Sequence, residues 1–353
     1  MKLAAIAITK EGARLAGEIA EYLDSSLEVY LPQKLANELK GREGVTFYSG
    51  SLRGLIKEIF NSYEGLIFIM ALGIVVRMVA ELLEDKRYDP AVVTINETND
   101  FVISTLSGHL GGANELTQHL AGLLGAQPVI TTATDSQGKL AIDMLAKELD
   151  CLIEPFANLK LINGALVNGE TINIYSEYEL ELEAEDDFNL YPVSSLAEAT
   201  APAVIISNQS FSLPSNLADQ AYLCLRPRNL VIGIGCRKGI SKERIAEAVE
   251  LALERVGADL EQVKCLATVD LKAQEVGLVT YAQEQDLELK IISREEIKNT
   301  DLEYSTSEFV KKAIGVGGVC EPVALLSGEQ MELLLKKTKV QGVTVAVAQE
   351  KSL

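Results

Sequence analysis

The feature that most constrains the fold of this chain is a regular alternation between short apolar runs and longer amphipathic runs. Over roughly the first 135 residues, brief runs rich in β-branched residues are bounded by turn residues, and segments with helical apolar spacing lie between them. Strands that alternate with helices of this length are typical of βαβ units, so the pattern predicts an α/β fold with a mainly parallel sheet. The strand-like runs are LAAIAIT, GLIFIM, AVVTIN, FVISTL and PVITT, and the helical runs include SLRGLIKEIFNSY, LGIVVRMVAELL and NELTQHLAGLL.

The alternation is interrupted after residue 135 and resumes near residue 226, which predicts a multi-domain protein of 353 residues. We expect an N-terminal α/β domain at 1–135, a small middle domain at 136–225 and a C-terminal α/β domain at 226–353. Ser241 is placed to cap the helical run SKERIAEAVELALERVG. The strands expected around it are NLVIGIGC, KCLATVDLK and LELKIIS, with GVTVAVAQ as the last strand of the same sheet.

The middle region carries a dense acidic stretch, with seven carboxylates between Glu177 and Asp187. Tyr178, Leu180 and Leu182 alternate there with glutamates, which is the periodicity of a strand. A cation site is one interpretation. We favour a solvated edge strand whose charges protect it from aggregation.

Charge narrows the classes of partner. The formal net charge of −19 argues against nucleic acid and against an anionic membrane surface, because both require basic residues. The most apolar run, 66–76, is half the length of a membrane-spanning helix. The five cysteines include no CxxC pair, which favours reduced thiols in a cytoplasmic protein over a disulfide framework or a zinc site.

The stretch SGHLGGANELTQHLAG, residues 107–122, contains both histidines of the chain. Gly111 and Gly112 precede a helical pattern, and glycines there leave backbone amides open to an anion or a carbonyl oxygen. His109 lies in the turn, where it can reach such a ligand. His119 lies roughly 15 Å further along the helix, so a metal shared by the two is not expected. His119 is also four residues beyond Glu115, with which it can pair.

A second motif, GIGCRKG at 233–239, connects a strand to a helix. Its glycine spacing departs from a dinucleotide fingerprint, and no acidic residue ends a following strand at the expected distance. Five basic and no acidic residues lie between Arg226 and Lys242, which indicates either a solvated loop or a binding site for a carboxylate-rich ligand, with Arg237 able to bind bidentately. Cys236 is expected to be a packing residue rather than a nucleophile, because no base lies near it in sequence.

The motifs of the first and last thirds resemble the CbiG family, the cobalt-precorrin-5A hydrolases of the anaerobic cobalamin pathway. The resemblance follows the family's order and spacing, whereas the middle third adds no independent support. It rests on GLIFIMALGIVVRMVAELLEDKRYDPAVVTIN, FVISTLSGHLGGANELTQHLAGLLGAQPVITTATD, GIGCRKG, LATVDLKAQEVGL, SEFV, VGGVCEPVALL and GVTVAVA.

The resemblance implies opening of a lactone on a cobalt tetrapyrrole and release of a two-carbon fragment as acetaldehyde. No cofactor and no protein-bound metal are expected, since the cobalt arrives with the substrate and the macrocycle accepts the electrons of carbon–carbon scission. Neighbouring cobalamin-pathway enzymes are possible partners. We expect His109 as general base, with Glu115 or Asp135 to orient or replace it. The residues expected to bind substrate are Arg77, Ser107, Gly108, Gly111, Gly112, Asn114, Gly235, Arg237 and Lys238.

Two other functions stay open from the sequence. The chain can be a tetrapyrrole-binding module that hands intermediates between enzymes without chemistry. It can also be a nucleotide-dependent α/β enzyme that uses GIGCRKG.

Overall fold

The structure is a computed structural model that describes residues 1–23, 27–180, 182, 187–209, 214, 217 and 220–353. It contains two compact units, Met1–Met144 and Leu145–Leu353. Three sheets lie in these units, two of them mainly parallel and one with parallel and antiparallel strand pairs in equal number, which confirms the multi-domain α/β prediction. The boundaries expected near residues 135 and 225 stay predictions.

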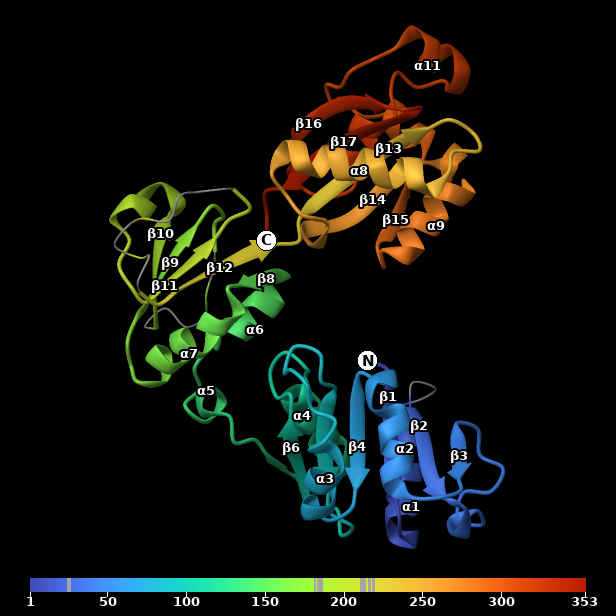
Figure 1. Ribbon diagram of the computed structural model, residues 1–353, viewed down its shortest axis with the longest axis vertical. Coiled ribbons are helices and arrows are strands. Elements are labelled where there is room, and N and C mark those ends of the chain that lie inside the picture. Colours follow the sequence, from blue (N-terminus) through green and yellow to red (C-terminus); the bar gives the residue numbers. More distant parts are fainter. Residues whose placement is uncertain (24–26, 181, 183–186, 210–213, 215–216, 218–219) are drawn as a thin grey trace. The chain divides into compact units, whose positions relative to one another are not determined.

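The first unit is built on a seven-stranded sheet in the order β3-β2-β1-β4-β5-β6-β7. The apolar runs form strands because both sheet faces are covered by helices, so nearly every residue of the central strands is buried. Helices α1 and α4 pack on one face, and α2 and α3 on the other (Figure 1). The strands are β1 (Leu3–Ala7), β2 (Leu27–Pro32), β3 (Val45–Tyr48), β4 (Gly65–Ile69), β5 (Ala91–Ile95), β6 (Phe101–Leu106) and β7 (Gln127–Val129); the helices are α1 (Lys10–Tyr22), α2 (Leu52–Ile59), α3 (Leu72–Val79), α4 (Ala113–Leu124), α5 (Ala133–Ser136) and α6 (Ile142–Glu148), which ends in the second unit.

One strand reversal decides where the polar residues of this unit gather. Strand β6 pairs antiparallel with β5, with Val92 opposite Leu106, and β7 runs parallel to β6. The carboxyl ends of β6 and β7 therefore lie at the edge where β1, β4 and β5 begin. The crevice at the carboxyl ends of β1 and β4, where a doubly wound fold commonly binds its ligand, is at the opposite edge.

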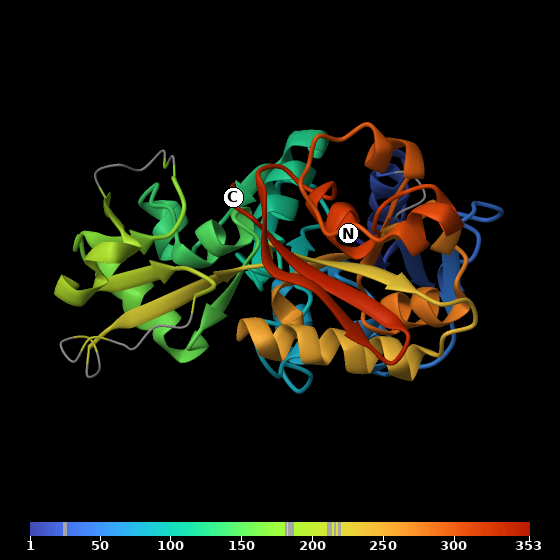
Figure 2. The same ribbon diagram turned by 90° about the horizontal axis from the view of Figure 1, so that it is seen from above.

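The second unit contains two five-stranded sheets, in the orders β10-β9-β11-β12-β8 and β15-β14-β13-β17-β16. In the latter sheet, α8 and α9 cover one face while α10 and α12 cover the other, and Figure 2 shows α8 along the β16–β17 hairpin. The strands are β8 (Cys151–Glu154), β9 (Ile172–Ser176), β10 (Phe188–Pro192), β11 (Ala203–Ile206), β12 (Tyr222–Pro227), β13 (Leu230–Cys236), β14 (Val263–Val269), β15 (Glu288–Ile292), β16 (Met331–Val340) and β17 (Val343–Glu350); the helices are α7 (Leu159–Val167), α8 (Lys242–Val256), α9 (Val276–Glu284), α10 (Arg294–Lys298), α11 (Glu308–Ile314) and α12 (Cys320–Leu325).

Most of the elements expected in the C-terminal region are confirmed. The run GVTVAVAQ forms β17, which pairs antiparallel with β13 in one sheet. Ser241 is the N-cap residue of α8, although its side chain makes no capping hydrogen bond. Strand β16, the partner of β17 in a hairpin, was not expected.

The acidic edge strand predicted from Tyr178 onwards is wrong at its start. Strand β9 ends at Ser176, whose hydroxyl bonds the backbone N–H and C=O of Tyr178 and so turns the chain. Tyr178 is buried, and the Glu177 carboxylate accepts a hydrogen bond from Ser207 and pairs with Lys351. Of the remaining stretch, residues 181 and 183–186 lie outside the part of the chain that the structure describes.

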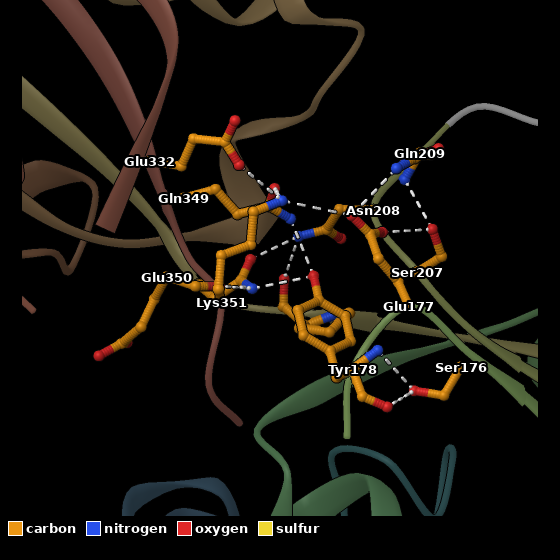
Figure 3. A network of polar contacts seen from close by, with 12 residues as sticks. Ser176, Glu177, Tyr178, Ser207, Asn208, Gln209, Glu332, Gln349, Glu350 and Lys351 are labelled. Atoms are coloured by element: carbon orange, nitrogen blue, oxygen red, sulfur yellow. Dashed lines mark hydrogen bonds and ion pairs between the residues drawn. The ribbon is translucent and has the colours of Figure 1, made fainter. Parts of the chain in front are cut away.

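A buried polar network joins the two sheets of the second unit around Tyr178 (Figure 3). The phenol oxygen accepts hydrogen bonds from the side-chain amides of Asn229 at 3.0 Å and Gln349 at 2.8 Å. Asn229 also donates to the carbonyl of Glu350 at 2.7 Å, and its own oxygen accepts from Asn208 at 2.6 Å. Tyr178 therefore belongs to the packing between sheets rather than to a solvated edge.

Candidate active site

The candidate site begins in the loop between β6 and α4, whose geometry is set by close backbone packing. The amides of Gly112 and Ala113 donate to the carbonyls of His109 at 2.9 Å and Ser107 at 3.0 Å, and the amide of Asn114 donates to the carbonyl of Gly108 at 2.9 Å. The expectation that this helix start leaves its amides open is therefore wrong for these three residues, because the loop itself satisfies them.

The glycines of this loop have packing reasons of their own. A Cβ atom on Gly111 would lie 2.4 Å from Cβ of Ser107, and one on Gly108 would lie 2.7 Å from the side-chain oxygen of Asn114. Gly112 has a φ of 83°, which a residue with a side chain rarely adopts. These contacts account for the glycines without a ligand, and a role for them in substrate binding stays a prediction.

The loop presents His109 to two carboxylates. Its Nε2 atom lies 2.7 Å from Oδ2 of Asp135, in α5, and its Nδ1 atom lies 3.0 Å from Oδ2 of Asp143, in α6. The Thr134 hydroxyl lies 3.3 Å from the same Nε2. The structure thus brings together two of the three residues expected to be catalytic, His109 and Asp135.

Asp143 is the member of the cluster that sequence reasoning missed. Its side chain is 6% exposed, against 11% for His109 and 32% for Asp135. A signal was present in LAIDML, where a single acid stands among residues that become the buried face of a helix. A charged residue in such a position is rarely buried without a partner.

Asn114, which was expected to bind substrate, fixes the exposed carboxylate. Its side-chain amide nitrogen donates to Oδ2 of Asp135 at 3.1 Å and to the Thr132 hydroxyl at 3.1 Å, and its oxygen accepts from the Ser104 hydroxyl at 2.6 Å. Oδ2 of Asp135 therefore has two partners. Oδ1 of the same carboxylate has no hydrogen bond to any described residue, so it is the oxygen left for a ligand.

The two carboxylates determine the charge of the imidazole. The hydrogen bond to Asp143, opposed by burial and reinforced by Asp135, raises the pKa of His109 to about 8. The ring is therefore mainly protonated at neutral pH and donates from both nitrogens. A histidine in this state is a hydrogen-bond donor rather than a ready base.

Other residues chosen from the sequence lie outside this cluster. Glu115 is on the exposed face of α4. His119 is also exposed and makes no hydrogen bond or ion pair with any residue that the structure describes, so its expected pairing with Glu115 is wrong. Arg77, in α3, donates to the carbonyl of Gly73 at 2.8 Å, and no described contact links it to His109.

The GIGCRKG turn in the second unit already binds a side-chain carboxylate of the same chain. The Glu275 carboxylate accepts from the Gly239 amide at 2.6 Å and from the Lys272 ammonium at 3.0 Å. Burial alone would raise the pKa of Glu275, but these two donors hold it below its ordinary value. This internal carboxylate occupies the amide that a phosphate would use, which disfavours the nucleotide alternative.

Two basic side chains of this region have no acidic partner among the described residues. Arg226, Arg228 and Lys242 form ion pairs with acidic residues. The side chains of Arg237 and Lys238 are exposed and have no ion pair or hydrogen bond among the described residues. Lys238 lines an open pocket of about 590 Å³ between the first turns of α8 and α9.

Gly235 and Cys236, which precede these cations, are packing residues. A Cβ atom on Gly235 would lie 2.6 Å from the hydroxyl oxygen of Thr344 in β17. Burial raises the pKa of the Cys236 thiol to about 11, so it is not an activated nucleophile, as expected.

Over the described residues, no three His, Cys, Asp or Glu side chains are grouped so that they could hold a metal ion. The same residues include no helix that is both long and apolar enough to span a membrane.

Comparison with known proteins assigns the whole chain to one family. Residues 54–135, 140–227 and 230–348 match the models described as cobalamin synthesis G N-terminal, cobalamin biosynthesis central region and cobalamin synthesis G C-terminus. Two relatives are named cobalt-precorrin-5A hydrolase. The protein of Priestia megaterium is 34% identical over 98% of this chain and 94% of its own length, and that of Salmonella typhimurium strain LT2 is 35% identical over 98% and 97%.

A crystal structure of a cobalamin biosynthesis protein G homologue from Sulfolobus solfataricus is 25% identical, covers 98% of this chain and 96% of its own, and has a TM-score of 0.40. The family-model matches reach all three sheets, although β1, β2 and β3 precede the first match, and they include the middle region, which the sequence motifs alone did not support. The chain belongs to the cobalamin synthesis G (CbiG) family.

Proposed function

We propose that this chain is a cobalt-precorrin-5A hydrolase, which opens the lactone of a cobalt tetrapyrrole and releases acetaldehyde in cobalamin biosynthesis. The observation that carries the proposal is the identity of 34–35%, over nearly the full length of both partners, with relatives named for that activity. The cluster around His109 supplies a proton-handling site that such chemistry needs.

The reaction requires one water and no external oxidant. The water oxygen bonds to the lactone carbonyl carbon, its proton leaves to a base, and the acyl carbon–oxygen bond breaks to give a carboxylate and a hydroxyl. Loss of the hydroxyl proton then forms the aldehyde C=O, while the carbon–carbon bond breaks and its electron pair enters the conjugated macrocycle. Cobalt belongs to the substrate, and we propose that no resident cofactor takes part.

In this proposal, Asp135 is the base. Its Oδ1 atom is the outward oxygen of a carboxylate whose other oxygen is fixed by His109 and Asn114. Oδ1 accepts the proton of the attacking water and returns it to the departing oxygen. This assignment replaces the expectation of His109 as base, because both ring nitrogens of His109 face carboxylates.

Arg237 and Lys238 are proposed to bind carboxylates of the substrate. A tetrapyrrole with acetate and propionate side chains is a polyanion, and these two cations lack internal partners in a chain of net charge −19. Arg77 and the loop residue Ser107 stay candidates for substrate contact, and Glu115 stays a candidate to orient or replace the base. Contact with neighbouring pathway enzymes and a location in the cytoplasm stay proposals as well.

The test is conversion of cobalt-precorrin-5A by the purified protein without added cofactor, with acetaldehyde and the opened product measured together. Acetaldehyde that forms equally fast without protein would contradict the proposal. Binding of the corrinoid without accelerated acetaldehyde release would instead indicate a handover module, and dependence on added nucleotide would indicate the nucleotide-dependent class.

The catalytic assignment is tested by Asp135→Asn, which should reduce turnover by about two to four orders of magnitude with corrinoid binding within a few-fold. His109→Ala should also be severely impaired, because it removes a partner of Asp135. His119→Ala is the matched control and should keep most activity. Equal losses in both histidine variants would indicate a folding defect of the segment and not a role of His109.

A further inference from the structure

The innermost member of the cluster has no access to substrate, yet it makes a direct contact with the ring that holds the proposed base. Exposure rises along the line of contacts, from 6% for the Asp143 side chain through 11% for His109 to 32% for Asp135. Each link is a hydrogen bond, at 3.0 Å to Nδ1 and 2.7 Å to Nε2 of the imidazole. The outer carboxylate is therefore the most accessible of the three side chains.

We infer that Asp143 is a positioning residue, which keeps the His109 ring oriented with its Nε2–H directed at Asp135. The inference rests on the proposed function for its consequence in catalysis, but the contact itself is independent of that function. A carboxylate on Nδ1 fixes the tautomer and the orientation of an imidazole, so that the second nitrogen donates in a defined direction.

The His109 ring has three described hydrogen-bond partners. The groups that face His109 are Asp143 from α6, Asp135 from α5 and the neutral Thr134 hydroxyl. Asp135 also accepts a hydrogen bond from Asn114, so a second partner besides His109 holds it in position. The Nδ1 side of the ring, in contrast, has Asp143 as the one hydrogen-bonded partner that the structure describes.

With two histidines in the chain, the inference can be tested by NMR titration of the imidazole signals. His119→Gln assigns the two signals. In the native protein His109 should titrate near 8. In Asp143→Asn its titration should move down by about one unit or more, because a neutral amide replaces an opposite charge. Asp301→Asn, at an exposed position without a described partner, is the matched control and should leave the His109 curve unchanged.

Two results would overturn the inference: a His109 curve in Asp143→Asn that coincides with the native curve, or a native His109 that titrates at or below its ordinary value of about 6.5. The second result needs no change at Asp143 and so is independent of any folding defect in Asp143→Asn. Activity provides the catalytic readout. Asp143→Asn should lower kcat with KM within a few-fold, and Asp143→Glu should recover part of the loss.

An unchanged kcat in Asp143→Asn despite a shifted His109 curve would refute the positioning role. An inactive native protein whose His109 curve behaves as expected would count against the proposed hydrolase function and leave the His109–Asp143 contact intact.

Discussion

Replacing Tyr178 by phenylalanine should weaken the packing between the two sheets of the second unit. The change removes one phenol oxygen that accepts from Asn229 and from Gln349. Asn229 keeps a second acceptor, the carbonyl of Glu350, for its amide group. The side-chain nitrogen of Gln349 has no other acceptor among the described residues, and Gln349 is 2% exposed.

The magnitude follows from that asymmetry. One buried N–H left without an acceptor costs about 1–3 kcal/mol, whereas deletion of a satisfied pair is nearly neutral. Tyr178→Phe should therefore lower the free energy of local opening by about 1–3 kcal/mol. The doubly substituted Tyr178→Phe/Gln349→Leu should lose less than the sum of the single changes, with a coupling of about 0.5–3 kcal/mol.

Native-state hydrogen exchange of the full chain, read by mass spectrometry on peptides from β13 and β17, measures this opening. Exchange there should accelerate about 5- to 150-fold, since each 1.4 kcal/mol is a factor of ten. Tyr191→Phe is the matched control, because Tyr191 is 41% exposed and its hydroxyl has no described partner. Equal protection in native protein, Tyr178→Phe and Tyr191→Phe would refute the reasoning.

Three further predictions concern both units. Gly111→Ala should destabilise the first unit by about 1–3 kcal/mol in chemical unfolding, since its Cβ would meet Ser107 at 2.4 Å, whereas Gly122→Ala in α4 has free space and should stabilise by up to about 1 kcal/mol; the same sign for both would contradict the packing argument. Reversing the charges of Arg237 and Lys238 together should weaken corrinoid binding in titrations, and added salt should weaken binding to the native protein similarly. Reversing the charges of two adjacent exposed lysines of α11 is the control and should leave binding unchanged. Binding that is unaffected by the Arg237 and Lys238 changes and by salt would show that these two residues belong to a solvated loop. Cys236 should resist iodoacetamide at neutral pH until the protein unfolds, because burial raises its pKa to about 11, and rapid labelling of native protein, detected by mass spectrometry, would contradict this.

The sheets could be predicted from sequence because the signal that defines them is local. A buried parallel strand between two layers of helices requires a short apolar run, and LAAIAIT and GLIFIM are such runs. The reversal of β6 against β5 has no such local signal. The run FVISTL has the same composition whichever way it pairs, so the edge at which His109 lies became known only with the strand register.

The residues of the candidate site likewise fall into those with a local sequence signal and those without one. His109 was selected because it lies in the turn beside Gly111 and Gly112, and Asp135 was named with Glu115 as a residue to orient or replace it. Asp143 lies 34 residues beyond His109, and its contact depends on how α6 packs. Tyr178 was misassigned because its local pattern was misleading. Alternation with glutamate is typical of a strand with one exposed face, but it contains no information about Gln349, which lies 171 residues away and supplies a polar partner.

The strand reversal also has a practical consequence for anyone who produces this protein. Because β6 ends where β1 begins, the side chain of Met1 reaches the loop between β6 and α4, and a Cβ atom on Gly112 would lie 3.0 Å from the terminal methyl group of Met1. An affinity tag fused ahead of Met1 would therefore begin at a residue that packs against this loop and would perturb that contact. A tag placed after Leu353 extends the second unit and leaves the sequence around Met1 unaltered, so it is the better choice where the Met1 contact must be kept.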